Sequence, residues 1–263
     1  NGKPLDAVVV GDISTALGDA KVNLDYSKPA NSKLLALKGD VETSKLNLGA
    51  ITSNQKLNQI SANANFDVSV SDSHRKGVVD GVVEFVDFNN YRFNNIDISA
   101  LIDGDFIEGN VNVDDPNVML AIDGSANVNK KSQQLNLHAD VSKINLDRIN
   151  LSKKYMTLSA IVDAEIDNFN IEESNGEINI SDFAFSDNPS KELNIKNIDI
   201  NIQNAVSPQY MSLQSDILNA SIEGSYSFKT IVPTIKEIMS HPFPVLFGED
   251  SSSKVKTPKE IIA

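Results

Sequence analysis

The sequence contains no cysteine and no tryptophan, and only three of its 263 residues are histidines. Without cysteine the chain can form no disulfide and no thiolate metal site, and it has no thiol nucleophile. Histidine is the usual base near neutral pH, and tryptophan offers the largest aromatic surface for stacking. The composition therefore gives little support to catalysis, and we expect the protein not to be an enzyme.

Positive charge is also scarce. Lysine and arginine total 23 against 36 for aspartate and glutamate, which gives a formal net charge of -13. A surface that neutralises many phosphates is difficult to build from such a chain. Nucleic acid is therefore not expected as a partner, and neither is a bare anionic membrane surface.

Long apolar runs are missing as well. No run approaches the roughly 18 residues that a membrane-spanning helix needs. The sequence starts at Asn1 without the basic and apolar leader of a secretion signal. Because Leu5–Val10 already has the pattern of a strand, and the last dozen residues begin a new polar-to-apolar pattern, we interpret the chain as a fragment of a longer protein.

What the sequence does contain is alternation with a period of two residues. From Ile60 to Val70 every even position is apolar and every odd position is polar, and Met156–Asp167 departs from this rule only at Ile161. Such alternation is typical of strands with one buried face. It predicts an all-β chain of about sixteen strands. Clusters of Asn, Asp, Gly and Ser supply short turns, so successive strands should pair antiparallel; these clusters lie at 103–105, 129–132 and 173–176.

An internal repeat of about one hundred residues underlies this pattern. Four segments recur in the same order: 37–41 as 137–141, 81–88 as 176–183, 93–98 as 195–200, and 121–125 as 221–225. A repeated module of several strands predicts an elongated sheet that grows by addition. We expect one continuous β segment over 1–263, made of the end of an upstream repeat (1–30), a first repeat (31–130), a second repeat (131–228), a helix and stop (229–248) and the start of a following segment (249–263).

One short α-helix is predicted near residues 229–240. Ile231, Ile235 and Ile238 have near-helical spacing there, and the proline-rich stretch from His241 to Pro244 ends it. We favour a helix that covers an edge strand over one that plugs a groove. A helix of a dozen residues cannot cover sixteen strands.

The apolar face of such a sheet must be covered, because burial stabilises by roughly 25 cal/mol per Å². A sandwich, a closed barrel and a long sheet folded about its own axis are the three available solutions. The predicted inner face is diluted with small residues such as Ala62, Ala126 and Ala160, and aromatic residues are only 6% of the chain. These small residues indicate either unfilled room or close packing of two sheets, and the pattern alone does not decide between them.

Several strings, taken in order, resemble the repeat of the TamB family within the AsmA-like group of bacterial envelope proteins. They are Val111–Val118 followed by Asp123-Gly124, then Leu135–Leu137, Asn175–Asp182 and Ser215–Gly224. The similarity runs from about Leu34 to the helix that follows Phe228. Each motif is degenerate, but their order over some two hundred residues is more specific. The family's amino-terminal membrane anchor and carboxy-terminal domain are missing, as expected of an excised middle section.

The resemblance implies an elongated antiparallel repeat sheet folded into an apolar groove, a β-taco. It also implies a periplasmic location in a Gram-negative envelope, with the full-length protein anchored in the inner membrane. The implied function is non-catalytic transport of phospholipid between the inner and outer membranes, with the acyl chains in the groove and an outer-membrane assembly partner. We expect the groove to be lined by one-sided apolar residues, namely Ile60, Ala62, Ala64, Phe66, Val68, Val70, Leu120, Ile122, Leu135, Leu137, Leu158, Val162, Ile166, Ile198, Ile200, Ile202, Ile222 and Phe228.

Two alternative functions remain open from the sequence. A scaffold could pair its edge strands with unfolded outer-membrane strands by β-augmentation. The other alternative is an extracellular adhesive or carbohydrate-binding β-solenoid, although the lack of tryptophan weighs against it.

No metal, cofactor or catalytic site is predicted. No loop has the twelve-residue spacing of a calcium site. We interpret the recurring carboxylates, including the pair Asp114-Asp115, as a solvated polar face. The three histidines are expected at the surface, because none has a serine elbow or acid partner nearby in the sequence; they are His74, His138 and His241.

Overall fold

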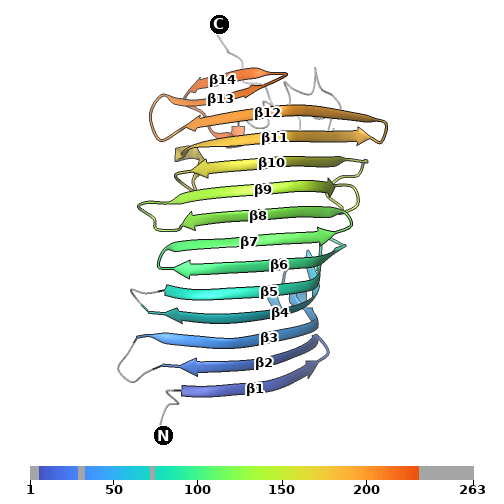
Figure 1. Cartoon of the computed structure of the whole chain (residues 1–263), viewed down its shortest axis with the longest axis vertical. Helices are drawn as coiled ribbons and strands as arrows, with labels where there is room; N and C mark the ends of the chain where they lie inside the picture. The colour runs from blue at the N-terminus through green and yellow to red at the C-terminus, as the bar shows by residue number, and fades with distance from the viewer. Residues whose placement is uncertain (1–5, 29–32, 72–74, 231–263) are drawn as a thin grey trace. The chain divides into compact units, whose positions relative to one another are not determined.

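The computed structural model describes residues 6–28, 33–71 and 75–230, which include one sheet of fourteen strands (Figure 1). The first seven strands are β1 (Asp6–Thr15), β2 (Gly18–Ser27), β3 (Leu35–Asn47), β4 (Leu57–Val70), β5 (Arg75–Phe88), β6 (Tyr91–Asp103) and β7 (Phe106–Asp115). The other seven are β8 (Val118–Asn127), β9 (Gln134–Asn145), β10 (Thr157–Ile166), β11 (Asn175–Asn188), β12 (Lys191–Gln203), β13 (Gln209–Ser215) and β14 (Asn219–Gly224). Two single turns lie between strands, α1 (Leu48–Thr52) and the 3₁₀ turn η1 (Ile171–Glu173).

The strands follow one another across the sheet in chain order, and every neighbouring pair is antiparallel. The all-β class and the antiparallel meander are therefore confirmed. The sequence predicts about sixteen strands, whereas the described residues form fourteen, several of them 13 or 14 residues long. Short turns of the expected kind connect them, such as the Asp103–Asp105 turn, where Gly104 has a φ of 65°.

The sheet is open and uncurled, which differs from the folded-over cross-section that the resemblance implies. In Figure 1 the strands stack as a ladder with β1 at one edge and β14 at the other. Among the described strands, β1 pairs only with β2 and β14 only with β13. Alternation determines which side chains share a face, but the curvature of a sheet depends on twist and on contacts outside each strand.

The sequence repeat corresponds to six strands. Its matched segments lie in β3 and β9, in β5 and β11, in β6 and β12, and in β8 and β14. The ranges 31–130 and 131–228 each contain six of these strands. A further match lies at the ends of β3 and β9, where Lys45–Leu48 answers Lys143–Leu146. At both places the chain leaves the sheet before it returns to it in the next strand.

The helical prediction falls mostly outside the described residues, which end at residue 230. The described turn α1 was not predicted, and Asn47 caps it by accepting a hydrogen bond from the Ala50 backbone N–H at 2.9 Å. The chain divides into two compact units, Asn1–Gly224 and Ser225–Ala263. The sheet belongs to the first unit.

Asp115 corrects the prediction that the carboxylates form a solvated face, because it is 1% exposed. Its carboxylate accepts hydrogen bonds from the hydroxyl of Tyr91, from the Asn94 backbone and side chain at 3.1 and 2.9 Å, and from the Asn117 backbone at 2.9 Å. The Asn145 side chain in turn donates to Asn117 at 2.9 Å. This Asp115 network connects the ends of β6, β7, β8 and β9.

Burial by itself raises the pKa of Asp115, but the hydrogen bonds from Tyr91, Asn117 and Asn94 outweigh burial and hold that pKa below its ordinary value of 3.8. The carboxylate is therefore ionised at neutral pH in the folded protein. Sequence reasoning missed the network because its members come from separate strands.

Candidate functional site

One face of the sheet carries continuous rows of apolar residues, which we call the apolar face. Directly paired residues on neighbouring strands point to the same side. Three such rows cross the sheet. The central row is Gly11, Val22, Val41, Ala64, Gly81, Ile98, Val111, Ile122, Ala139, Val162, Ile180 and Ile198.

The two other rows extend over all fourteen strands. The second row is Val9, Leu24, Gly39, Phe66, Val79, Ala100, Gly109, Gly124, Leu137, Ala164, Ile178, Ile200, Leu213 and Ala220. The third row is Ala7, Tyr26, Leu37, Val68, Gly77, Ile102, Ile107, Ala126, Leu135, Ile166, Gly176, Ile202, Met211 and Ile222. At about 4.8 Å per strand, these rows are roughly 60 Å long.

The structure brings most of the predicted lining residues together in these rows. The central row contains Ala64, Ile122, Val162 and Ile198. The second row contains Phe66, Leu137 and Ile200, and the third row contains Val68, Leu135, Ile166, Ile202 and Ile222. The remaining sheet residues pair with apolar side chains of β3, β5, β7 and β9: Ala62 with Val83, Leu120 with Val113, Ile60 with Val86, Val70 with Leu35 and Leu158 with Ile144. Phe228 lies in the second unit and takes no part in the sheet.

These side chains are only partly covered. Of the predicted lining residues, Ile202 is buried, Val70 is exposed, and the others are half-buried. A sandwich core would bury them almost completely, because its two inner faces interdigitate. The half-burial therefore arises from neighbours within one layer, and no described strand packs on top of them.

Small residues shape this face. Ala139 lies between Ile122 and Val162 in the central row and is 6% exposed, because its larger neighbours rise above it. In the second row, three small residues are adjacent across β6, β7 and β8, namely Ala100, Gly109 and Gly124. The small residues are thus mixed with large side chains within one layer, and they do not mark close packing of two sheets.

Sequence reasoning missed part of the apolar face. Val79 and Val83 belong to it, but the pairs Val78-Val79 and Val82-Val83 place valine on both sides of β5 and hide the alternation. The pairing of each strand with its neighbours resolves which valine is on which side. Other members of the three rows were also missed, including Val22, Leu24, Val41, Ile98, Ile102, Ile107, Val111, Ile178, Ile180, Met211 and Leu213.

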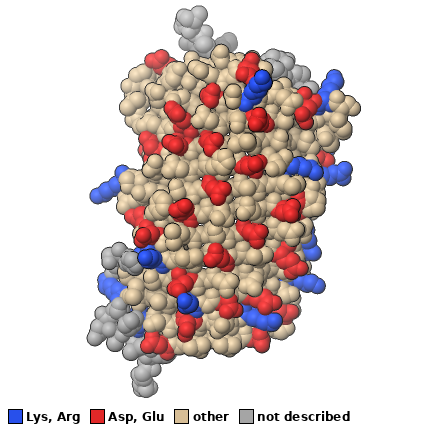
Figure 2. Space-filling model, viewed as in Figure 1, with Lys and Arg blue, Asp and Glu red and all other residues tan. Residues whose placement is uncertain are grey.

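The opposite face is polar and acidic. Figure 2 shows acidic side chains spread over the whole of one side of the molecule, with the basic ones mostly near its margins. Across the middle of this side runs one row of directly paired residues, which we call the polar row. Its members are Val10, Asn23, Asp40, Asn65, Asp80, Ser99, Asn110, Asp123, His138, Asp163, Asn179, Asp199, Gln214 and Asn219.

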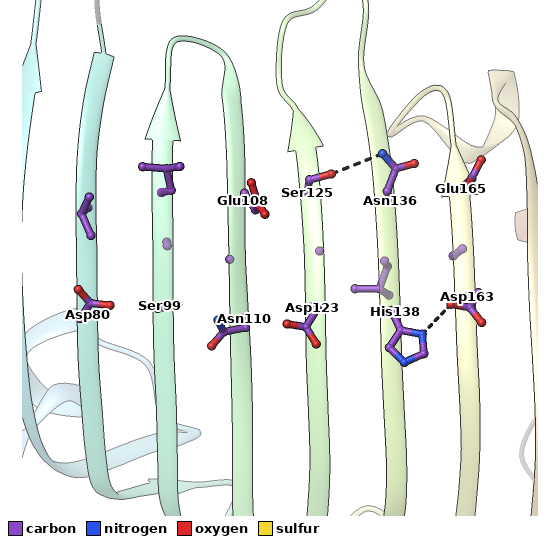
Figure 3. A pocket seen from close by; sticks show the side chains of 17 residues that line it. Asp80, Ser99, Glu108, Asn110, Asp123, Ser125, Asn136, His138, Asp163 and Glu165 are labelled. Atoms are coloured by element: carbon purple, nitrogen blue, oxygen red, sulfur yellow. Dashed lines mark hydrogen bonds and ion pairs between the residues drawn. The ribbon is translucent and has the colours of Figure 1, made fainter.

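A shallow hollow of about 610 Å³ lies on this polar face across β5 to β10 (Figure 3). Five acidic side chains surround the hollow, held side by side by neighbouring strands: Asp80, Glu108, Asp123, Asp163 and Glu165. The described residues contain no group of three or more His, Asp or Glu side chains arranged to hold a metal ion. This face repels anionic groups and offers no apolar surface of comparable extent.

His138 lies in this hollow beside Asp163, and the two side chains are 2.6 Å apart at their closest atoms. The hydrogen bond to Asp163, with the negative charges of Asp163, Asp123 and Asp140, raises the pKa of His138 above its ordinary value of 6.5. The prediction that His138 lies on the polar surface is correct. His74 and His241 lie outside the described residues.

We expect an NMR titration to give a pKa for His138 above 6.5, and Asp163→Asn to lower it, because this change removes the nearest negative charge. Asp167→Asn is the control, since Asp167 is not among the groups that shift His138. An equal His138 pKa in wild type and Asp163→Asn would show that the 2.6 Å contact does not form in solution.

Within the described residues no helix has the length and apolarity to cross a membrane. Comparison of the chain with protein-family models, with curated proteins and with solved structures finds no match.

Proposed function

We propose that this chain is a non-catalytic lipid-binding segment of an envelope protein, and that phospholipid acyl chains lie along its apolar face. The observation that carries the proposal is the continuity of that face: two apolar rows cross all fourteen strands, and most of the predicted lining side chains in them remain half-buried. Covering them with hydrocarbon would be favourable by roughly 25 cal/mol per Å². No reacting group is needed for this function.

The dimensions of the face suit acyl chains. The hydrocarbon core of a bilayer is about 30 Å thick, so one tail spans about half of that, and a face of roughly 60 Å has room for several tails in succession. The acidic polar face disfavours phosphate head groups. Phospholipid would therefore contact one side of the sheet only, with its head groups at the margin of the apolar face.

The wider setting of the proposal rests on the resemblance to the TamB family described above. In that setting the chain is a middle section of a periplasmic protein, which is anchored in the inner membrane and carries phospholipid towards the outer membrane. An outer-membrane assembly partner belongs to the same setting. The six-strand repeat supports this part of the proposal, because a repeating sheet can extend a lipid path by simple addition of modules.

The test compares Val162→Asp with Ile161→Asp. Val162 lies in the central apolar row between Ala139 and Ile180, whereas Ile161 points to the other face between Asp140 and Ser181. Native mass spectrometry of protein purified under mild conditions should find phospholipid on wild type and on Ile161→Asp, and at least about tenfold less on Val162→Asp, because a carboxylate in contact with tails must be desolvated.

Circular dichroism spectra would establish that both variants keep their strands. Wild-type protein without lipid, or equal lipid on the two variants, would contradict the proposal. Transfer of fluorescent phospholipid between vesicles provides a second readout, in which only Val162→Asp should be slow.

A further inference from the structure

Two excursions leave the sheet at the same margin, six strands apart. The first, residues 48–56 with α1, follows β3, and the second, residues 146–156, follows β9. Since every neighbouring pair of strands is antiparallel, β3 and β9 end on the same side of the sheet. The β5–β6 turn connects the excursions: the Asn89 N–H donates to the Lys56 carbonyl at 2.8 Å. The Asn150 side chain donates to the carbonyls of Asn89 and Asn90 at 3.2 and 3.1 Å. We call this side of the sheet the bridged margin.

The second excursion has a fixed conformation. The Leu146 N–H donates to the Met156 carbonyl at 2.8 Å and closes its base, and the Leu151 N–H donates to the Leu146 carbonyl at 2.9 Å. Ile149 is 4% exposed. The backbone that carries the exposed side chains is therefore held in place before any ligand binds, which lowers the entropy cost of binding.

The bridged margin is basic, although the net charge of the chain is -13. Its connections carry four basic residues against two acidic ones: Lys56, Arg148, Lys153 and Lys154 against Asp147 and Asp216. At the opposite margin, the connections that the structure describes in full carry two basic and four acidic residues; they are 104–105, 128–133, 167–174 and 204–208. An anionic group is therefore attracted to the bridged margin more than to the opposite one.

Exposed apolar side chains accompany these charges. Ile51 on the first excursion is 54% exposed, and Leu151 and Tyr155 on the second are 63% and 38% exposed. Tyrosine and aliphatic side chains beside lysine or arginine are typical of protein surfaces at the boundary between hydrocarbon and water. The composition of both excursions therefore suits a ligand with an anionic head and an apolar tail.

The second excursion also adjoins the residues expected to contact lipid tails. A hollow of about 450 Å³ brings Arg148 and Tyr155 together with Leu158, one of the predicted lining residues. Asp147 and Glu192 line the same hollow. Arg148 lies 3.5 Å from Asp147, but its side chain is still 71% exposed and can reach a further anion.

We infer that the bridged margin binds the phosphate head groups of phospholipids whose tails lie on the apolar face, with one head-group site at each excursion. Arg148, Lys153 and Lys154 form the second site, and Lys56 contributes to the first. Their charged groups donate charge-assisted hydrogen bonds to phosphate oxygens. The inference rests on the proposed lipid binding and adds to it the margin at which the head groups lie.

The spacing of the excursions agrees with this arrangement. Six strands at about 4.8 Å each place the two sites roughly 29 Å apart. One acyl tail spans about half of a hydrocarbon core of about 30 Å, so two lipids bound in succession would not overlap. Each six-strand repeat would then supply one head group site.

Native mass spectrometry tests the inference with two lipids that differ only in the head group. The protein is incubated with detergent-dispersed phosphatidylglycerol and diacylglycerol, in equal amounts and with the same acyl chains. Wild type should carry at least about fivefold more phosphatidylglycerol, the effect of about one basic residue beside an anionic lipid. Lys56→Gln/Arg148→Gln/Lys153→Gln/Lys154→Gln should carry both lipids in similar amounts, because the apolar face is unchanged.

The matched control is Arg75→Gln/Lys76→Gln/Lys130→Gln/Lys131→Gln. It removes four exposed basic residues at the opposite margin and has the same net charge as the first variant. This control should keep the preference of wild type, and circular dichroism should show that both variants keep their strands. A preference that is lost in both variants, or kept in both, would overturn the inference.

A competition experiment separates lipid from free phosphate. Inorganic phosphate in excess should leave the bound phosphatidylglycerol in place, because the free ion gains nothing from the apolar face. Displacement of the lipid by inorganic phosphate would contradict the inference.

The fate of this inference is separable from that of the proposed function. Val162→Asp should lose both lipids, since it changes the surface that contacts the tails. Wild type that carries the two lipids in equal amounts would overturn the head-group assignment alone. Wild type that carries neither lipid would overturn both proposals.

Discussion

Replacing Asp115 by alanine is expected to lower the free energy of unfolding by about 3 kcal/mol, with a fall of about 10 °C in the unfolding temperature. The carboxylate accepts hydrogen bonds from Tyr91, Asn94 and Asn117, and at 1% exposure no solvent replaces it. Its removal leaves several buried donors without a partner. Thermal unfolding followed by circular dichroism measures the effect.

Asp114→Ala is the matched control, since Asp114 precedes Asp115 in β7 and is exposed. It should change the stability by less than about 0.5 kcal/mol. Hydrogen exchange should show the loss of protection in Asp115→Ala concentrated in β6 to β9, which the network connects. If the two variants unfold at the same temperature, the Asp115 network does not stabilise the fold.

The contribution of Asp115 also depends on pH. Because its folded pKa lies below its ordinary value of 3.8, the stabilisation is fully present above the unfolded pKa and is lost as the pH falls through the folded pKa. The difference in stability between wild type and Asp115→Ala should therefore be constant near neutral pH and should narrow below about pH 4.

Replacing Gly39 by alanine is the second change with a large expected effect. A Cβ atom at this position in β3 would overlap the backbone oxygen of Asn23, so the strands β2 and β3 would have to separate locally. Overpacking of this kind typically costs roughly 1–3 kcal/mol, and a backbone oxygen cannot rotate away, so we expect about 2 kcal/mol or more. Thermal unfolding again provides the measurement.

Gly81→Ala is the control for this change. Gly81 lies in the interior strand β5 on the same face, but an added Cβ would meet its nearest atom at 3.6 Å, an ordinary contact. We expect no loss of stability there, and a gain of up to about 1 kcal/mol, because alanine restricts the unfolded chain. If Gly39→Ala and Gly81→Ala changed the stability equally, the close approach of β2 to β3 would relax at little cost in free energy.

The single-layer architecture explains why these effects should be local. Each strand packs chiefly against its two neighbours, so the stability is close to a sum over neighbouring pairs. A defect in β3 should therefore loosen one part of the sheet and leave β11 to β14 in place. Because each strand is held chiefly by its two neighbours, the apolar face can extend across the sheet without a central core.

The sequence by itself determined the strands, their antiparallel order and the side of the sheet on which most apolar residues lie. Alternation with a period of two is a local property, since a residue such as Phe66 must point away from Asp67 in any extended strand. The hundred-residue repeat was also visible in the sequence, and its matched segments lie six strands apart in the sheet. The sequence alone also places Leu137 and His138, which are neighbours in one strand, on opposite faces of the sheet.

Only the tertiary structure decided how the strands combine. The pairing of neighbours showed that Val79 rather than Val78 belongs to the apolar face, and it brought Tyr91, Asn94 and Asn117 around Asp115. It also gave an open sheet in place of a folded one, and isolated Val10 as the apolar exception in a polar row. These features depend on contacts between residues far apart in the chain, and alternation within one strand contains no information about them.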